Sequence, residues 1–162
     1  MRKAALVLIM LVPLAIAGCG YSLLTKKAIQ VSDIKIGKIT NGTNEPELDD
    51  ELVSALSGEL MKQGIHLDSH SQNQIYGTIN SFVLTGVTDI NDVFTAYQVS
   101  IEGKFYFKGA DGREIPLRGQ NPFIVTFQST GQMNVVYALR QIAVQGALKD
   151  LSSEIVSSFI YR

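Results

Sequence analysis

The sequence predicts an α+β domain: a two-layer sandwich in which a mixed four-stranded sheet carries two helices on one face. Two observations predict this class. Two segments repeat apolar residues at helical spacing, and one segment alternates apolar and polar residues, as a strand covered on one side does. The elements follow in the order strand, helix, strand, strand, strand, helix (β-α-β-β-β-α). A helical crossover makes the first two strands parallel, and the later strands can form an antiparallel meander.

An N-terminal segment precedes this domain. Arg2 and Lys3 are followed by an apolar run over residues 4–17. That run is shorter than the roughly 20 apolar residues that a membrane-spanning helix needs. Residues 1–18 are therefore predicted to be a signal peptide, with a charged start, a short apolar centre and small residues before the cleavage site.

Cys19 is the only cysteine of the chain and follows Ala17 and Gly18. This ending resembles the lipobox of bacterial lipoproteins, in which the thiol receives a diacylglycerol, the chain is cut before the cysteine, and the new amine is acylated. Three acyl chains exceed the two membrane signals that stable anchoring needs. Cys19 is thus the predicted lipidation site, followed by a tether over residues 19–28 and a single periplasmic domain over residues 29–162. The alternative is a chance thiol in an ordinary secretory signal.

Length and charge limit the possible functions. Cleavage before Cys19 leaves 162 − 18 = 144 residues, the size of one domain, with 14 − 2 = 12 basic and 15 acidic residues. A net charge of 12 − 15 = −3 gives no general basic field, so nucleic acid is not an expected partner. Gly20 follows the cysteine where inner-membrane lipoproteins usually have Asp. By that resemblance, the chain is expected at the outer membrane, lipid-anchored on the periplasmic side.

The first strand and the first helix are separated by a strong turn signal, Asn41-Gly42. The helix is predicted to begin at Asn44 as N-cap, with Glu47 three residues later, and to end at Gly64. The apolar residues of the strand are Ile29, Val31, Ile34, Ile36 and Ile39. The apolar face of the helix comprises Leu48, Leu52, Ala55, Leu56 and Leu60.

The second half of the chain supplies three strands and a long helix. A second strand is predicted over residues 74–84, and a third over residues 97–107, where apolar and polar residues alternate most clearly. A glycine-rich turn at 109–112 leads towards a fourth strand at 123–127. Residues 134–161 keep their apolar side chains close to one stripe and are predicted to form the last helix.

The sequence contains no convincing catalytic constellation. It has neither a Gly-x-Ser-x-Gly nucleophile motif nor a glycine-rich phosphate loop ending in Lys-Ser/Thr. His66 and His70 flank Asp68, but they follow the helix end, and a metal site needs more ligands than these. They are interpreted as solvated surface residues. No enzymatic activity, metal or cofactor is expected.

Basic residues gather in and around the predicted hairpin between the third and fourth strands. They are Lys104, Lys108, Arg113 and Arg118. Glu102, Asp111 and Glu114 partly neutralise them. Two interpretations stay open: a solvated hairpin, or a site for phosphorylated sugar or lipid headgroups, since Arg and Lys bind phosphate well.

Aromatic residues are also predicted on the uncovered face of the sheet. Tyr106 lies on the polar side of the third strand, and Tyr76 and Phe82 are predicted to share that face. Scattered surface aromatics need no functional explanation. The alternative is an interface with a larger partner, where Tyr and Phe are enriched.

Five motifs in order carry a resemblance to a known family. They are Gly18-Cys19-Gly20-Tyr21, Ile39-Thr40-Asn41-Gly42-Thr43-Asn44-Glu45-Pro46-Glu47-Leu48, Leu52-Val53-Ser54-Ala55-Leu56, Ile75-Tyr76-Gly77-Thr78-Ile79 and Ala96-Tyr97-Gln98-Val99-Ser100-Ile101. In this order and spacing they resemble the LptE family, the lipopolysaccharide-assembly lipoproteins of the outer membrane.

The resemblance implies a function without catalysis. LptE proteins have the two-layer sandwich fold and sit in the lumen of the β-barrel protein LptD, which they help to fold and which they plug. The pair delivers lipopolysaccharide to the outer leaflet, and family members use basic residues to meet its phosphates. On local charge alone, Lys108, Arg113 and Arg118 are the candidate lipopolysaccharide contacts.

A second group of lipoproteins shares the same strand, turn and helix opening. It includes relatives of the curli exporter and activators of cell-wall synthases. The exporter needs additional hairpins to form its pore, and this chain has no room for them. The alternative function is therefore a lipoprotein that activates a cell-wall synthase or serves another envelope-export complex, and an unrecognised periplasmic hydrolase ranks third.

Overall fold

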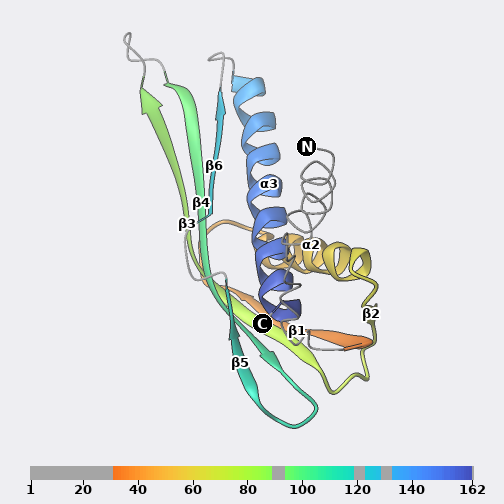
Figure 1. Ribbon diagram of the computed structural model, residues 1–162. Helices are drawn as coiled ribbons and strands as arrows, with labels where there is room; N and C mark the ends of the chain where they lie inside the picture. Colours follow the sequence, from red (N-terminus) through yellow and green to blue (C-terminus); the bar gives the residue numbers. More distant parts are fainter. Residues whose placement is uncertain (1–30, 89–93, 119–122, 129–132, 162) are drawn as a thin grey trace, which may run out of the picture.

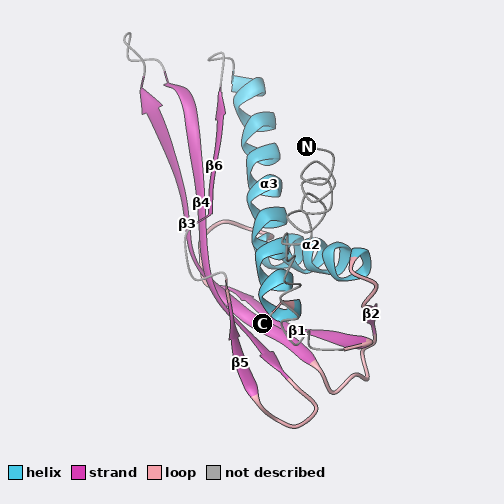
Figure 2. Cartoon of the chain, viewed as in Figure 1, coloured by secondary structure: helices cyan, strands magenta, loops and turns pink. Residues whose placement is uncertain are grey.

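The computed structural model describes residues 31–88, 94–118, 123–128 and 133–161. They form an α+β sandwich in which a six-stranded mixed sheet carries two helices on one face (Figures 1 and 2). The predicted class is confirmed, with six strands in place of four. The predicted lipidation site Cys19, the predicted signal peptide 1–18 and the predicted tether 19–28 lie outside the described residues.

The strands run in the order β2-β1-β3-β4-β5, and β6 also pairs with β4. Their bounds are β1 Asp33–Asn41, β2 His66–Leu67, β3 Gln74–Thr88, β4 Phe94–Lys108, β5 Glu114–Leu117 and β6 Phe123–Gln128. β1 is parallel to β3, as the helical crossover predicts, and β4 is antiparallel to β3, β5 and β6. The two strands that the sequence did not predict, β2 and β5, have only two and four residues, too few to show a period.

The long strand β4 divides the sheet into two halves. One edge of β4 pairs with β3, while the other pairs with β5 over Phe105–Lys108 and with β6 over Ala96–Ile101. We call β2, β1, β5 and the parts of β3 and β4 beside them the wide half. The narrow half comprises β3 residues 81–88, the N-terminal part of β4, and β6 (upper part of Figure 1).

A β-bulge in β3 marks the boundary between the halves. Ile79 pairs with Gly103 and Ser81 pairs with Glu102, so Asn80 is an extra residue on β3. Side chains alternate between the two faces of a strand, and one extra residue exchanges the faces of all that follow. The bulge therefore reverses which β3 side chains point towards the helices.

The reversal corrects the predicted position of Phe82. Before the bulge, Ile75 and Ile79 are fully buried under the helices. After it, Phe82 and Leu84 pack against the core, and Val83 is 48% exposed on the opposite face. The prediction that Phe82 shares the uncovered face with Tyr106 is therefore wrong.

Both helices bury one face against the sheet and against each other. α2 spans Leu48–Lys62 and α3 spans Met133–Ile160. α2 buries Leu48, Leu52, Leu56 and Leu60, and α3 buries Ala143, Val144, Ala147, Leu148, Leu151, Ile155, Val156 and Phe159. Within the described ranges, neither helix is long and apolar enough to cross a membrane.

The start of α2 differs from the prediction. Asn44 is not the cap: the helix begins after Glu47, which has a left-handed backbone (φ 63°) and makes no side-chain capping bond. The turn is held instead by Asn41, whose Nδ2 donates to the Glu45 carbonyl (2.6 Å) and whose Oδ1 accepts from the Thr43 N–H (2.9 Å). An Asx turn at the end of β1 therefore directs the chain into the helix.

Phe105 lies at the centre of the wide half and is fully buried. Its ring lies over two glycines: a Cβ on Gly77 would come within 2.4 Å of Phe105 Cδ1, and one on Gly103 within 2.5 Å of Phe105 Cε2. Gly77 is also the direct cross-strand partner of Phe105. The two glycines therefore provide the space that the ring fills.

Candidate functional site

The sheet face opposite the helices carries a hollow of about 380 Å³, which we call the open-face hollow. It is lined by Lys38, Thr40, Tyr76, Gly77, Thr78, Asn80, Lys104 and Tyr106. These residues come from β1, β3 and β4. Gly77 contributes backbone, and the side chains of the others point away from the core. The hollow thus lies over the wide half, on a rigid support.

Two tyrosines form one wall of the open-face hollow. Tyr76 and Tyr106 are direct cross-strand partners, and their rings stack with centroids 5.6 Å apart and an interplanar angle of 22°. The prediction that these two share the uncovered face is confirmed. Partial burial, and then a hydrogen bond to the Glu114 carboxylate, raises the pKa of Tyr76 above its usual range. The phenol is therefore neutral at physiological pH.

Two lysines complete the open-face hollow. Lys38 comes from β1 and Lys104 from β4, and among the described residues neither forms a salt bridge. Two ammonium groups, two phenol rings and neighbouring hydroxyl and amide groups suit an anionic, hydroxyl-rich ligand or a polar interface. Sequence analysis missed Lys38 because a register shift between Ile36 and Ile39 places it on this face.

The three candidate lipopolysaccharide contacts lie apart from one another. Lys108 Nζ lies 4.0 Å from Glu114 Oε1, and Arg113 Nε lies 3.3 Å from Asp111 Oδ2. All four residues belong to the exposed β4–β5 hairpin. Arg118 is exposed beyond the other end of β5, about 17 Å along the strand from Arg113. The structure thus gives two of them acidic partners and does not bring the three together.

The histidines lie at the margin of the wide half. His66 belongs to β2, and the His70 ring nitrogen Nδ1 lies 3.3 Å from the Asp68 carboxylate, with all three residues exposed. Within the part of the chain that the structure describes, no group of three His, Cys, Asp or Glu residues could hold a metal ion.

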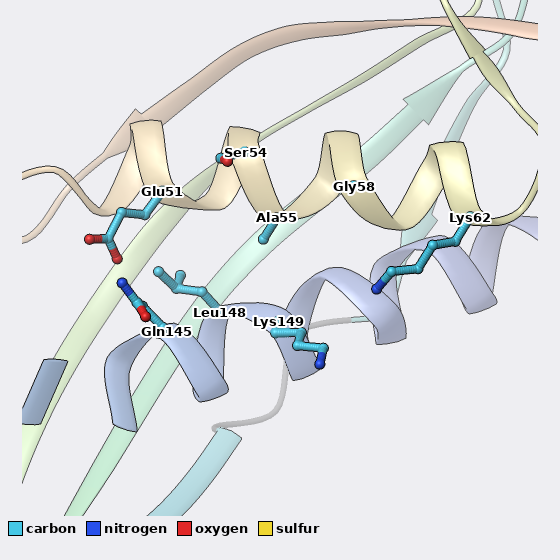
Figure 3. A pocket seen from close by; sticks show the side chains of 8 residues that line it. All are labelled: Glu51, Ser54, Ala55, Gly58, Lys62, Gln145, Leu148 and Lys149. Atoms are coloured by element: carbon cyan, nitrogen blue, oxygen red, sulfur yellow. The ribbon is translucent and has the colours of Figure 1, made fainter. Parts of the chain in front are cut away.

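A second hollow, of about 320 Å³, lies between the two helices (Figure 3). It is lined by Glu51, Ser54, Ala55, Gly58, Lys62, Gln145, Leu148 and Lys149. Glu51 Oε2 is buried there without a hydrogen-bond partner among the described residues. A Cβ on Gly58 would meet nothing within 4 Å, so part of this hollow is space that a side chain at that position would fill.

The described residues form a small α+β sandwich whose sheet face opposite the helices carries the open-face hollow. No family model and no curated protein sequence matches the chain. Among solved structures, it is similar to the rare lipoprotein B of Shewanella oneidensis, with a TM-score of 0.56 and 8% identity over 78% of this chain and 92% of that one. It is also similar to a lipoprotein of Caulobacter crescentus, with a TM-score of 0.51 and 18% identity over 74% of this chain and 83% of that one. At these identities the similarity establishes a shared fold.

Proposed function

We propose that this chain is an outer-membrane lipoprotein that partners an LptD-like β-barrel translocon and assembles lipopolysaccharide at the cell surface, as plug and assembly factor. The observation that carries the proposal is the fold shared with rare lipoprotein B across 92% of that chain. The ordered motifs from Gly18 to Ile101, which resemble the LptE family, support it independently.

The open-face hollow supports a binding role without chemistry. Lys38 and Lys104 offer two positive charges on the sheet face opposite α2 and α3, beside the stacked pair Tyr76 and Tyr106. Lipopolysaccharide carries phosphates and sugars, which Lys and aromatic side chains can contact. Lys108, Arg113 and Arg118 remain predicted contacts of the same ligand.

The lipid anchor is tested by labelling. Labelled palmitate should enter the wild-type chain and not the Cys19→Ser variant, because the acyl chains are attached at that residue. Equal labelling of both chains would contradict the lipoprotein assignment.

The partner is tested by purification. The tagged full-length chain, extracted in mild detergent, should bring down a large outer-membrane β-barrel protein in roughly equal amount. Depletion of the chain should lower lipopolysaccharide at the cell surface. Recovery of a cell-wall synthase in place of the barrel would favour the alternative function.

A further inference from the structure

The narrow half of the sheet has an open edge. β1 ends beside the first part of β3, where the Gly42 N–H donates to the Ile79 carbonyl (2.8 Å), and the chain then turns away towards α2. Residues 81–88 of β3 continue past this point and pair with β4 on one side (left edge of Figure 1). Within the described ranges no strand pairs with their other side. Among the described residues, no strand therefore continues the position of β1 beside residues 81–88, and Thr43, Asn44 and Glu45 of the turn line a hollow with the first of them, Ser81 and Phe82.

This open edge lacks the features that protect the other edges. Natural sheets block edge pairing with short strands, charges, proline or a covering element. β2 has only two residues, and the part of β1 that extends past it carries Lys35 and Lys38. β5 has four residues with Pro116 among them, and β6 contacts α3. Residues 81–88 read Ser-Phe-Val-Leu-Thr-Gly-Val-Thr, with no charged residue and no proline. The longest open edge of the described sheet is thus the one without protection.

Apolar side chains flank the open edge on both faces of the sheet. Val83 is 48% exposed on the face opposite the helices. On the helix side, the Arg140 guanidinium lies 5.8 Å from the centre of the Phe82 ring. Tyr137 lies three residues before Arg140 on α3, hence on the same helix face, and is 65% exposed. A strand added here would lie beside Val83 on one face and, on the other, beside Tyr137 and the Arg140–Glu45 ion pair.

We propose that residues 81–88 pair with the same residues of a second copy of this chain, antiparallel and about a two-fold axis. A second copy fits because an uncharged strand can face itself without like-charge repulsion. The pairing uses the same edge of both copies, so it closes at two copies and does not extend into a fibre. The proposal goes beyond the proposed function, because it requires no barrel.

The small size of the paired segment, residues 81–88 of each copy, limits the affinity of this dimer. A standard interface buries about 800 Å² per partner, and a single short edge pairing is smaller. The dimer is therefore weak in dilute solution. Lipid anchoring would confine the chains to one surface and raise their effective concentration, which favours pairing.

Sedimentation equilibrium of the purified full-length chain, in a density-matched detergent, tests the proposal. We expect a reversible monomer–dimer equilibrium between micromolar and near-millimolar concentrations. Val83→Lys should weaken the dimer by about tenfold, because each dimer carries two copies of the charge beside the shared ladder. Leu67→Lys is the matched control: Leu67 is 41% exposed on the β2 edge, and its substitution should leave the dimer unchanged.

Hydrogen exchange of the wild-type chain gives a second measurement that needs no variant. The backbone amides of residues 81–88 should exchange more slowly as the chain concentration rises, and those of β2 should not change. A chain that stays monomeric throughout, or a dimer that Val83→Lys leaves at full strength, overturns the proposal. Protection at β2 or β6 in place of β3 would also overturn it.

Discussion

The two halves of the sheet differ in how completely they are covered. In the wide half, both helices pack over the strands, and the centre holds Phe105 with no exposed surface. In the narrow half, α3 is the one described helix that covers the sheet (Figure 1). The described side chains of α3 show the change: the buried ones fall between Ala143 and Phe159, while Tyr137 and Ile142 are 65% and 64% exposed. The wide half therefore holds most of the described buried core, and the narrow half leaves Val83, Tyr137 and Ile142 exposed.

Truncating one phenylalanine in each half gives the largest expected difference. Phe105→Ala should lower the free energy of unfolding by about 3–5 kcal/mol, because it removes a fully buried ring and leaves a cavity. Phe82→Ala, the matched variant in the narrow half, should cost about 1–2 kcal/mol because its ring is only partly buried. Urea denaturation of both variants measures the two costs. Equal losses of unfolding free energy would contradict the difference in burial between the wide half and the narrow half.

Adding a methyl group beneath Phe105 tests the same packing from the other side. Gly77→Ala places a Cβ 2.4 Å from Phe105 Cδ1 and 2.5 Å from the Lys104 carbonyl oxygen, and backbone cannot move aside cheaply. We expect a loss of about 1–3 kcal/mol from overpacking. Thermal unfolding followed by circular dichroism measures it. A variant as stable as the wild type would show that the wide half is less rigid than its geometry indicates.

The long elements of the wide half were predictable, whereas its short strands β2 and β5 were not. The alternation around Phe105 and Phe107 predicted β4 and its buried face, and β1 and α2 occur close to where the apolar periods place them. In β3 the same alternation failed at Asn80, because a bulge shifts the period by one residue and gives no turn signal of its own. In the sequence, the bulge is visible only as a shift of the apolar positions from odd numbers, Ile75 and Ile79, to even numbers, Phe82 and Leu84.

The candidate site was predictable only where alternation held. Tyr76 and Tyr106 were placed together correctly because no irregularity separates them along β3 and β4. Lys38 was missed because the register shift in β1 moves it to the open face. The charge cluster was a sequence cluster: Arg113 and Arg118 are close in number but lie at opposite ends of β5. The sequence therefore showed that basic residues are frequent in this segment, but not that their side chains lie together in space.

Comparing two double variants in lipopolysaccharide binding tests whether the open-face hollow or the β4–β5 hairpin contacts the ligand. The double variant Lys38→Ala with Lys104→Ala should weaken lipopolysaccharide binding to the purified chain by about tenfold, because it removes both cations from one surface. Arg113→Ala with Arg118→Ala should have a smaller effect, because Arg113 already pairs with Asp111. Binding measured at two salt concentrations checks that the lost affinity is electrostatic, because salt screens the attraction between exposed charges.

If the arginine variants lose more affinity than the lysine variants, the ligand meets the β4–β5 hairpin and not the hollow. If neither pair changes affinity, these residues belong to the solvated surface, and the open face then serves the protein partner alone.

The smallest expected effect comes from Gly58, where the helix layer over the wide half is incompletely filled. Gly58 has no close neighbour to exclude a side chain, and glycine costs a helix interior about 0.5–1 kcal/mol relative to alanine. Gly58→Ala should therefore stabilise the chain by that amount, measured by urea denaturation beside Gly77→Ala as the opposite case. A destabilised Gly58→Ala variant would show that the space between α2 and α3 does not accept a side chain at this position.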